Sequence, residues 1–506
     1  MKANLKFLFC FSVLLIVFIF YAHTINYQWK HFDEQIIYKE TVVPIANSFS
    51  EILEYIKYFG LNNHFEASNP FYSSISNIRR VPLDNLFTMI TFYLFKKSAL
   101  TYHVFSLFLH LFNTLLLFLI LDKISLVYSE KNFNKARLFL ISLLTLLWAL
   151  HPTNVESILF TTNWSVVLTY SLCLYLLFFF LKKGSTLNHL ILFVVFLICQ
   201  GTREYPIVIP VIFFLYIYAS YLFNNPKTKI SEALSLALSK TFYLFIIAII
   251  FVLYSLSSPL ARGMPWHTST TIERIFWFSP HIFVHFIKLI IFPLHLSIDQ
   301  TAMVRFGKTL FDPYSIFCFI FMYSFLLLLV ISLIFIRKKA GYFFFISFFP
   351  FVASLIPFLH ILSPAYCIIS ERYLYFPLAM LIFGISHFIF STISRSRGIA
   401  CYTPTLVILF IVVSLFSSRT YFRTFVWKDS ITLFTSALKE SPNDLFSALR
   451  ISMLGSLLSD NSKIKSKNYA YNAVNILEGS INKLEEEKKS YEDKIPKIIK
   501  IGRAHV

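Results

Sequence analysis

Long apolar runs recur along the whole chain, and they limit its possible folds more than any other feature. A hydrocarbon core about 30 Å thick needs roughly 20 apolar residues per helical crossing. The chain has 506 residues, 57% of them hydrophobic and 60 of them Phe, which is more apolar surface than a soluble domain can bury. We therefore predict an all-α polytopic membrane protein with about eleven transmembrane helices, over residues 4–22, 99–122, 136–151, 165–182, 188–201, 205–223, 240–256, 313–336, 342–362, 373–392 and 402–418.

Basic residues in the short connections predict the orientation of these helices. They gather at Lys131, Lys135 and Arg137, at Lys182 and Lys183, at Lys227, Lys229 and Lys240, at Arg337 to Lys339, and at Arg395 and Arg397. The positive-inside rule places all of them in the cytoplasm, together with the N-terminus, and an odd number of crossings then puts the C-terminal tail outside. This distribution accounts for the net charge of +19, and it gives no reason to invoke nucleic acid because no base-reading module is present.

Two stretches of the predicted membrane domain, residues 1–418, depart from the simple pattern of crossings. Residues 23–98 form a long outer loop with a mixed polar and aromatic composition. Residues 272–300 are apolar enough to cross, but a crossing there would place the basic residues 337–339 outside, so we predict a re-entrant or interfacial helix. On that helix one face carries polar side chains, which we expect to meet water, headgroups or a cavity: His281, His285, Lys288 and His295.

The tail, residues 419–500, becomes polar and resembles the end of a tetratricopeptide repeat (TPR). Leu433, Phe434, Ala437 and Leu438 share one face of a predicted helix that ends before Pro442. Residues 501–506, IGRAHV, match the translation of a common sequencing adapter, so we expect them to be non-native and the tail to be truncated.

Polar clusters are predicted to end near the same outer membrane face, and their residue types suit one chemistry. They are Asp33 with Glu34, Arg79 with Arg80, His151 with Glu156, Arg203 with Glu204, and Glu371 with Arg372. A carboxylate can take a proton from a hydroxyl or hold a divalent metal, and arginine can hold a leaving phosphate with two hydrogen bonds. These groups therefore suit the transfer of a group from a membrane-anchored phosphate carrier to a hydroxyl.

Each cluster also has a plain structural interpretation. Asp33 and Glu34 can be a solvated helix flank, and His151 a residue that ends a helix. Arg203–Glu204 and Glu371–Arg372 can be pairs that neutralise one another at a membrane boundary, and the histidine face can belong to a helix lying along the interface. The six cysteines lie in or beside apolar runs and show no disulfide or zinc pattern.

Several short motifs occur in order along the chain. They are Asp33-Glu34 after the first helix, Arg80 to Leu83 (RVPL), His103, His110 and Asn113 in the next helix, His151-Pro152 before Val155-Glu156-Ser157, Arg203-Glu204, Pro293 to Asp299 (PLHLSID), and Glu371 to Tyr375 (ERYLY). In this combination the chain resembles the transmembrane and TPR O-mannosyltransferase family and its bacterial relatives, within the C-type glycosyltransferase superfamily. One departure is Asn163-Trp164, where the family has Gly-Arg.

The resemblance implies an inverting glycosyltransferase that moves a sugar, mannose in this family, from a polyprenyl- or dolichyl-phosphate to a hydroxyl of a protein or glycan acceptor. It implies a multi-pass protein of a bacterial inner membrane, or of the endoplasmic reticulum in a eukaryote. Asp33 and Glu34 are then the catalytic candidates, and they would also hold Mg or Mn if a metal is used; no other cofactor is implied. The candidates for binding the donor phosphate and sugar are Arg80, His151, Glu156, Arg203, Glu204, Lys288, Glu371 and Arg372.

Two other functions fit the same sequence. A polymerase or ligase of cell-envelope polysaccharide would share the donor and differ in the acceptor. A non-enzymatic scaffold would bind partners through the outer repeats, and its polar clusters would tolerate substitution.

Overall fold

The computed structural model describes most of the membrane domain and the first helix of the tail. The described residues are 2–28, 48–57, 82–96, 98–128, 134–182, 186–256, 270–298, 300–307, 309, 311–361, 368–393 and 403–440. Asp33, Glu34 and Arg80 lie outside them, as do residues 441–506 of the proposed repeat tail and its non-native end.

Every regular element within the described ranges is a helix. In chain order they are α1 (Lys2–Tyr21), η1 (Ala22–Asn26), α3 (Phe49–Lys57), α5 (Pro82–Phe95), α6 (Ala99–Tyr128), α7 (Asn134–Ala149), α8 (Asn154–Leu159), η2 (Thr161–Asn163), α9 (Trp164–Phe180), α10 (Thr186–Thr202), η3 (Tyr205–Val208), α11 (Ile209–Asn224), α12 (Ile230–Leu256), α13 (Thr271–Glu273), η5 (Arg274–Phe278), α14 (Ser279–Ile291), η6 (Thr301–Met303), α15 (Pro313–Ile334), α16 (Lys339–Leu355), η7 (Ile356–Phe358), η8 (Glu371–Leu374), α17 (Tyr375–Ile393), α18 (Thr403–Val426) and α19 (Ser430–Glu440).

The predicted helical membrane protein is confirmed at this level. Among the described residues, nine helices are long and apolar enough to cross a membrane. Eight of the nine coincide with crossings predicted from the sequence. The ninth, Thr271–Ile291, is the segment predicted to be re-entrant, and its length would allow it to cross.

Three predicted crossings, 136–151, 165–182 and 188–201, correspond to shorter helices. α7 has 16 residues, and α9 and α10 have 17 each. At 1.5 Å per residue such helices are about 24 to 26 Å long, less than the roughly 30 Å of a hydrocarbon core. All three have one end beside a polar motif: α7 ends before His151, α9 begins after Asn163, and α10 ends before Arg203.

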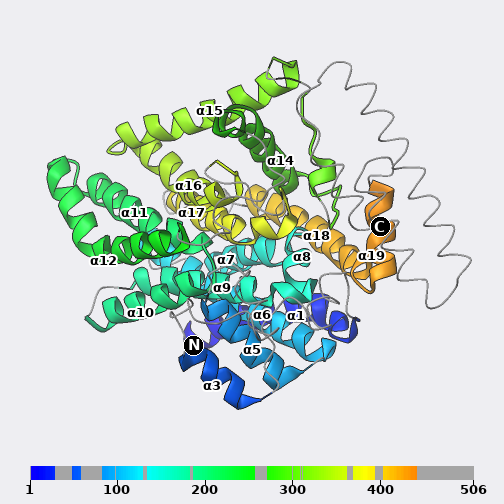
Figure 1. The fold of residues 1–506 in the computed structure, drawn as a ribbon. Coiled ribbons are helices and arrows are strands. Elements are labelled where there is room, and N and C mark those ends of the chain that lie inside the picture. Colours follow the sequence, from blue (N-terminus) through cyan, green and yellow to red (C-terminus); the bar gives the residue numbers. More distant parts are fainter. Residues whose placement is uncertain are drawn as a thin grey trace, which may run out of the picture.

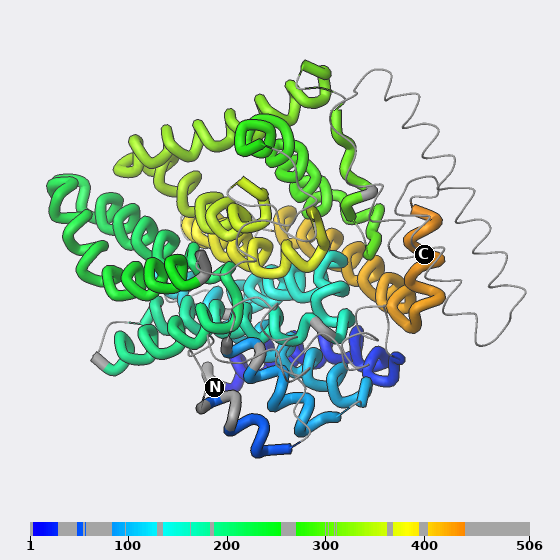
Figure 2. The backbone as a smooth tube through the Cα atoms, in the orientation of Figure 1, coloured from blue at the N-terminus to red at the C-terminus, as the bar shows by residue number. Residues whose placement is uncertain are grey.

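The helices surround a central group formed by α6, α7, α9 and α17. Figure 1 shows α10 to α12 on one side of this group, α14 to α16 above it, and α18 with α19 on the other side. The tube in Figure 2 shows the N-terminal helices α1 to α6 together at the bottom. Within the group α6 contacts α7, α9 and α17, so one helix links segments that are far apart in the sequence.

A glycine allows α16 and α17 to pack unusually closely. A Cβ atom built on Gly384 would lie 2.3 Å from the Ser347 carbonyl oxygen, a distance that real Cβ atoms do not reach. Small residues at such contacts let helix backbones approach in a membrane, where hydrophobic burial gives little driving force. This contact fixes α17, whose N-terminal end follows directly from η8.

The segment Thr271–Ile291 is one continuous helical stretch with a local change of winding. Thr270 and Glu273 form a capping box at its start, with hydrogen bonds of 3.2 and 2.8 Å, and η5 is a π-helical turn before α14. His281 and His285 face the interior, where His281 Nε2 accepts from the Gly307 backbone at 3.1 Å. Of the water, headgroups or cavity expected beside this face, water and headgroups are thus excluded for these two residues, because Gln300 lies against His285, and Gly307 and Ser315 lie against His281.

The first tail helix packs largely as its spacing predicts. Leu433, Phe434 and Ala437 are buried on α19, Leu438 is half-buried, and Trp427, between α18 and α19, is fully buried. α18 extends to Val426, eight residues beyond the predicted crossing that ends at 418. The polar start of the tail is thus a continuation of a transmembrane helix into the cluster described next.

Candidate functional site

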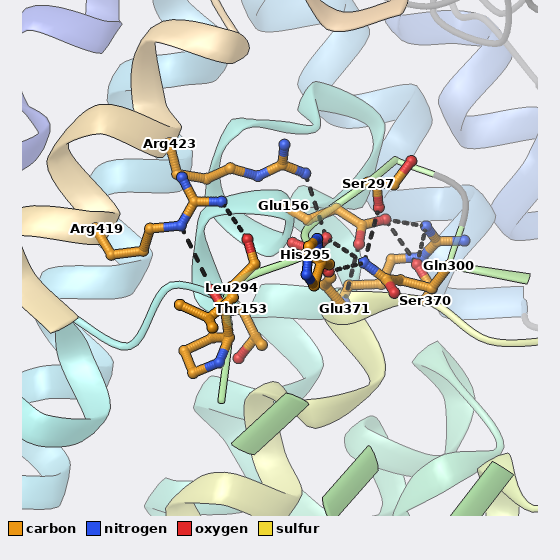
Figure 3. A network of polar contacts seen from close by, with 12 residues as sticks. Thr153, Glu156, Leu294, His295, Ser297, Gln300, Ser370, Glu371, Arg419 and Arg423 are labelled. Atoms are coloured by element: carbon orange, nitrogen blue, oxygen red, sulfur yellow. Dashed lines mark hydrogen bonds and ion pairs between the residues drawn. The ribbon is translucent and has the colours of Figure 1, made fainter. Parts of the chain in front are cut away.

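Two fully buried carboxylates mark the candidate site. Glu156 lies on the short helix α8, which follows the His151-Pro152 turn, and Glu371 begins η8 after the extended residue Ser370. Figure 3 shows the two carboxylates close together, with side chains from α18 and from the 294–300 segment around them. We name this group the carboxylate–arginine cluster; it consists of Glu156, Glu371, Arg372, Arg423 and Gln300.

Glu156 holds Arg372 through both of its carboxylate oxygens. Its Oε1 accepts from the Ser370 hydroxyl at 2.6 Å and from Nη1 of Arg372, and its Oε2 accepts from the Arg372 backbone N–H at 3.2 Å. The Arg372 side chain is 19% exposed, whereas the Glu156 side chain is completely buried. Glu156 therefore fixes the position of a guanidinium that itself reaches the surface.

Glu371 joins a second set of partners. Its Oε1 accepts from Nε2 of Gln300 at 2.8 Å and from Nη2 of Arg423 at 3.2 Å. Gln300 in turn accepts a hydrogen bond from Nε2 of His285, 3.0 Å away. Arg423 is buried, so the two charges of this pair are both removed from water and must neutralise each other.

His151 lies beside the cluster, in the turn between α7 and α8, and joins two helices. Its Nε2 donates to the Ile290 carbonyl oxygen at 3.1 Å, and its Nδ1 lies 2.8 Å from the Thr153 hydroxyl. The ring therefore ties α8 to the end of α14.

Arg203 lies at the other predicted cluster and pairs across helices. Its Nη2 is 3.2 Å from Oδ2 of Asp84 on α5 and donates to the Ser165 hydroxyl at 2.8 Å. Glu204, its sequence neighbour, is half-buried at the start of η3. The interpretation of Arg203–Glu204 and Glu371–Arg372 as self-neutralising neighbours is wrong, because Arg203, Arg372 and Glu371 all pair with residues from distant segments.

Aromatic rings in contact connect the Arg203 segment to the cluster. The Tyr205 ring lies 4.7 Å from Phe358, and Phe358 lies 4.6 Å from Tyr373, which is next to Arg372. Of the predicted donor-binding residues, the structure thus brings Glu156, Glu371 and Arg372 into direct contact and places His151 and Arg203 at the margins. Lys288 is exposed on α14, away from these contacts.

Sequence reasoning did not select three residues of the site. Asp84 interrupts an apolar segment of the outer loop, Gln300 follows the PLHLSID motif, and Arg423 lies beyond the last predicted crossing. The signal for Arg423 is a basic residue in the continuation of an apolar helix, which is costly unless it is paired.

The described part of the chain contains no group of three or more His, Cys, Asp or Glu side chains that could hold a metal ion. A metal held by Asp33 and Glu34 therefore stays a prediction about residues outside it. Comparison with known proteins adds no assignment, since no family model, no curated protein and no solved structure matches this chain.

Proposed function

We propose that this protein is a membrane glycosyltransferase that moves a sugar from a polyprenyl- or dolichyl-phosphate carrier to a hydroxyl acceptor on the outer face. The observation that carries the proposal is the contact between Arg372, which is partly exposed, and Glu156, which is completely buried. Glu156 receives three hydrogen bonds in the interior and orients the Arg372 guanidinium, and a partly exposed guanidinium held in this way is suited to binding an external anion.

The chemistry of the arginine favours a phosphate as that anion. A guanidinium is planar, always charged and able to bind two phosphate oxygens at once, and preorganisation reduces the entropy lost on binding. The rings of Phe160 and Tyr373 lie 5.6 and 5.3 Å from the Arg372 guanidinium carbon, so its plane is restrained by more than the ion pair. The carrier's isoprenoid chain would lie in lipid beside the apolar helices.

The short helices α7, α9 and α10 support the same interpretation. A crossing of 16 or 17 residues leaves the polar residues at its end roughly 5 Å nearer the membrane centre than a full-length crossing would. A phosphate attached to a lipid tail is held at the membrane surface, close to these helix ends. The polar residues at the ends of these helices would meet such a phosphate without requiring it to leave the membrane surface.

In the proposed reaction the acceptor oxygen forms a bond to the anomeric carbon of the sugar, and the bond from that carbon to the phosphate oxygen breaks. The electron pair of the broken bond stays on the lipid phosphate, whose charge Arg372 stabilises, with Arg203 as a second candidate. The hydroxyl proton passes to a carboxylate, which we assign to Asp33, with Glu34 as its neighbour. Attack opposite the leaving phosphate inverts the anomeric configuration.

The test is a transfer assay with the purified full-length protein, radiolabelled polyprenyl-phosphate sugars including mannose, and both peptide and glycan acceptors. Asp33→Asn keeps the size of the side chain and removes its charge, so transfer should fall at least about 100-fold. Lys39→Gln, a nearby change in the outer loop, is the matched control and should be almost silent. Transfer to glycans alone would support the polymerase or ligase, and a correctly inserted Asp33→Asn protein with the wild-type rate would refute the catalytic role.

A further inference from the structure

A second charged group lies at the opposite end of the helices and differs from the first in its charge balance. We name it the basic cluster; it consists of Lys6, Lys123, Arg137 and Lys182 around Asp122. α7 begins near Arg137 and ends near His151, so its length of about 24 Å separates the basic cluster from the carboxylate–arginine cluster. The orientation predicted from the basic loops places this end in the cytoplasm.

Asp122 connects three helices in this cluster. Its Oδ2 lies 2.7 Å from Nζ of Lys6 on α1, and its Oδ1 lies 3.3 Å from Nη2 of Arg137 on α7. The Asp122 side chain is buried, whereas that of Lys6 is 40% exposed. Within the described residues the buried Nε of Arg137 has no hydrogen-bond partner, so this guanidinium is incompletely satisfied.

Two further cations share one aromatic ring beside this carboxylate. Nζ of Lys123 lies 4.0 Å from the centre of the Phe178 ring and donates to the Phe178 carbonyl oxygen at 3.1 Å. Nζ of Lys182 lies 5.4 Å from the same ring and 4.4 Å from that of Phe179. Rings and a carbonyl attract these ammonium groups, but they supply no negative charge.

Among the described residues, two of the four cations thus pair with Asp122 and the other two lie at the Phe178 ring, and we propose that the basic cluster binds the phosphate headgroup of an anionic membrane lipid. A phosphate would bring the compensating charge and would fill donors that Asp122 leaves unsatisfied. Lys6 and Lys182 are accessible enough to reach it, and Lys123 and Arg137 lie deeper. A basic pocket between transmembrane helices on the cytoplasmic side is the usual form of such a site.

Apolar side chains next to the cluster favour a lipid over a soluble phosphate. Phe7 and Leu8, which follow Lys6 on α1, are 71% and 57% exposed, and Val127 near the end of α6 is 75% exposed. Acyl chains attached to the bound phosphate would cover these surfaces. A free phosphate ion would leave these apolar side chains exposed. A lipid would place its headgroup at the basic cluster and its acyl chains against these side chains.

The experiment compares phosphatidylglycerol with phosphatidylcholine as ligands of the full-length protein in neutral detergent, with bound lipid counted by native mass spectrometry. Wild-type protein should prefer phosphatidylglycerol. Each lysine near a membrane surface contributes enough attraction that Lys123→Gln with Lys182→Gln should lower the apparent affinity roughly 30-fold. The single change Lys182→Gln, at an exposed position, should lower it about fivefold and covers the case in which the double variant folds poorly.

The matched control is Lys227→Gln with Lys229→Gln, which removes the same charge from exposed positions between α11 and α12. This control should stay within about twofold of wild type, because general surface charge contributes little when the site is specific. An equal loss in both double variants, or no loss in Lys182→Gln, would overturn the proposal. Complete competition by millimolar inorganic phosphate would support the anion site and overturn a lipid as its ligand.

Discussion

The two charged clusters lie at opposite ends of the same helices and differ in how their charges are compensated. The carboxylate–arginine cluster places two carboxylates against two arginines, and three of these four groups, Glu156, Glu371 and Arg423, are buried. The basic cluster pairs two cations with Asp122 and holds two more at the Phe178 ring, and Lys6 and Lys182 reach the solvent. Among the described residues, the first cluster has as many carboxylates as arginines, whereas the second has four cations and one carboxylate.

This difference in charge compensation determines which substitutions each cluster can tolerate. In the low dielectric of the interior a balanced pair is held rigidly, and loss of one member leaves a charge with no compensation. In a half-exposed cluster water and ions can compensate, so charge imbalance costs little and an external anion can enter. We therefore expect the first cluster to fix geometry for catalysis and the second to accept a ligand.

The largest expected effect is on Arg423, the buried partner of Glu371. Arg423→Met leaves the Glu371 carboxylate buried with only the neutral donors Gln300 and the Ser297 backbone among its recorded partners, and breaking a buried pair in this way costs about 3–5 kcal/mol. Unfolding of the purified protein in mixed micelles, followed by temperature or denaturant, measures this loss. Glu371→Gln in the same protein removes the stranded charge and should restore most of the stability; a single variant within about 1 kcal/mol of wild type would contradict the interpretation.

Arg372 should show a smaller effect on stability and a large one on activity. Arg372→Lys keeps a cation beside Glu156 but loses the planar pair of donors, so transfer should fall roughly 100-fold, a typical cost of removing one transition-state donor. The transfer assay and the unfolding midpoint are measured on the same preparation. Arg305→Lys, at an exposed arginine over Tyr314, is the control and should change transfer less than about twofold.

The helices of this fold could be predicted from the sequence, but the ion pairs could not. Apolar runs of the right length indicate helices directly, and the face of α19 follows from residue spacing. Glu156 and Arg372 are 216 positions apart, and Glu371 and Arg423 are 52 apart. Hydropathy gives neither the rotation of a helix about its axis nor its neighbours. From the sequence alone, adjacent residues of opposite charge such as Arg203 and Glu204 are therefore the pairs that one predicts.

The depth at which a polar side chain is buried could not be predicted from the sequence either. Spacing places His281 and His285 on one polar face of a helix, yet both are buried against Gln300, Gly307 and Ser315. Spacing shows which residues share a side of a helix, and only tertiary packing decides what lies against that side.

Substitution of Asp122 tests whether the basic cluster tolerates the loss of a charge better than the carboxylate–arginine cluster does. Asp122→Asn leaves Lys6 and Arg137 without their shared carboxylate. Because the Lys6 side chain is 40% exposed and that of Arg137 only 13%, the cost should be roughly 1–2 kcal/mol, between that of a surface pair and a buried one. Raising the salt concentration from 0.1 to about 0.5 M should recover part of this loss by screening the repulsion among the cations. The loss in Arg423→Met should not respond to salt; equal responses in both variants would remove the distinction between the clusters.

The smallest effect is expected for the exposed ion pair between His295 and Glu440. Nδ1 of His295 is 2.9 Å from Oε2 of Glu440, and it links the 292–300 segment to α19, but the His295 side chain is 60% exposed. An exposed pair contributes up to about 1 kcal/mol, so Glu440→Gln should lower stability by no more than that, and amide hydrogen exchange should show α19 still protected. Leu433→Ala, which removes a fully buried side chain from the same helix, should cost about 2–5 kcal/mol and expose α19 to exchange. If Glu440→Gln instead released α19 as strongly as Leu433→Ala, charge rather than apolar packing would hold the tail, and the contrast between buried and exposed pairs would fail in this part of the molecule.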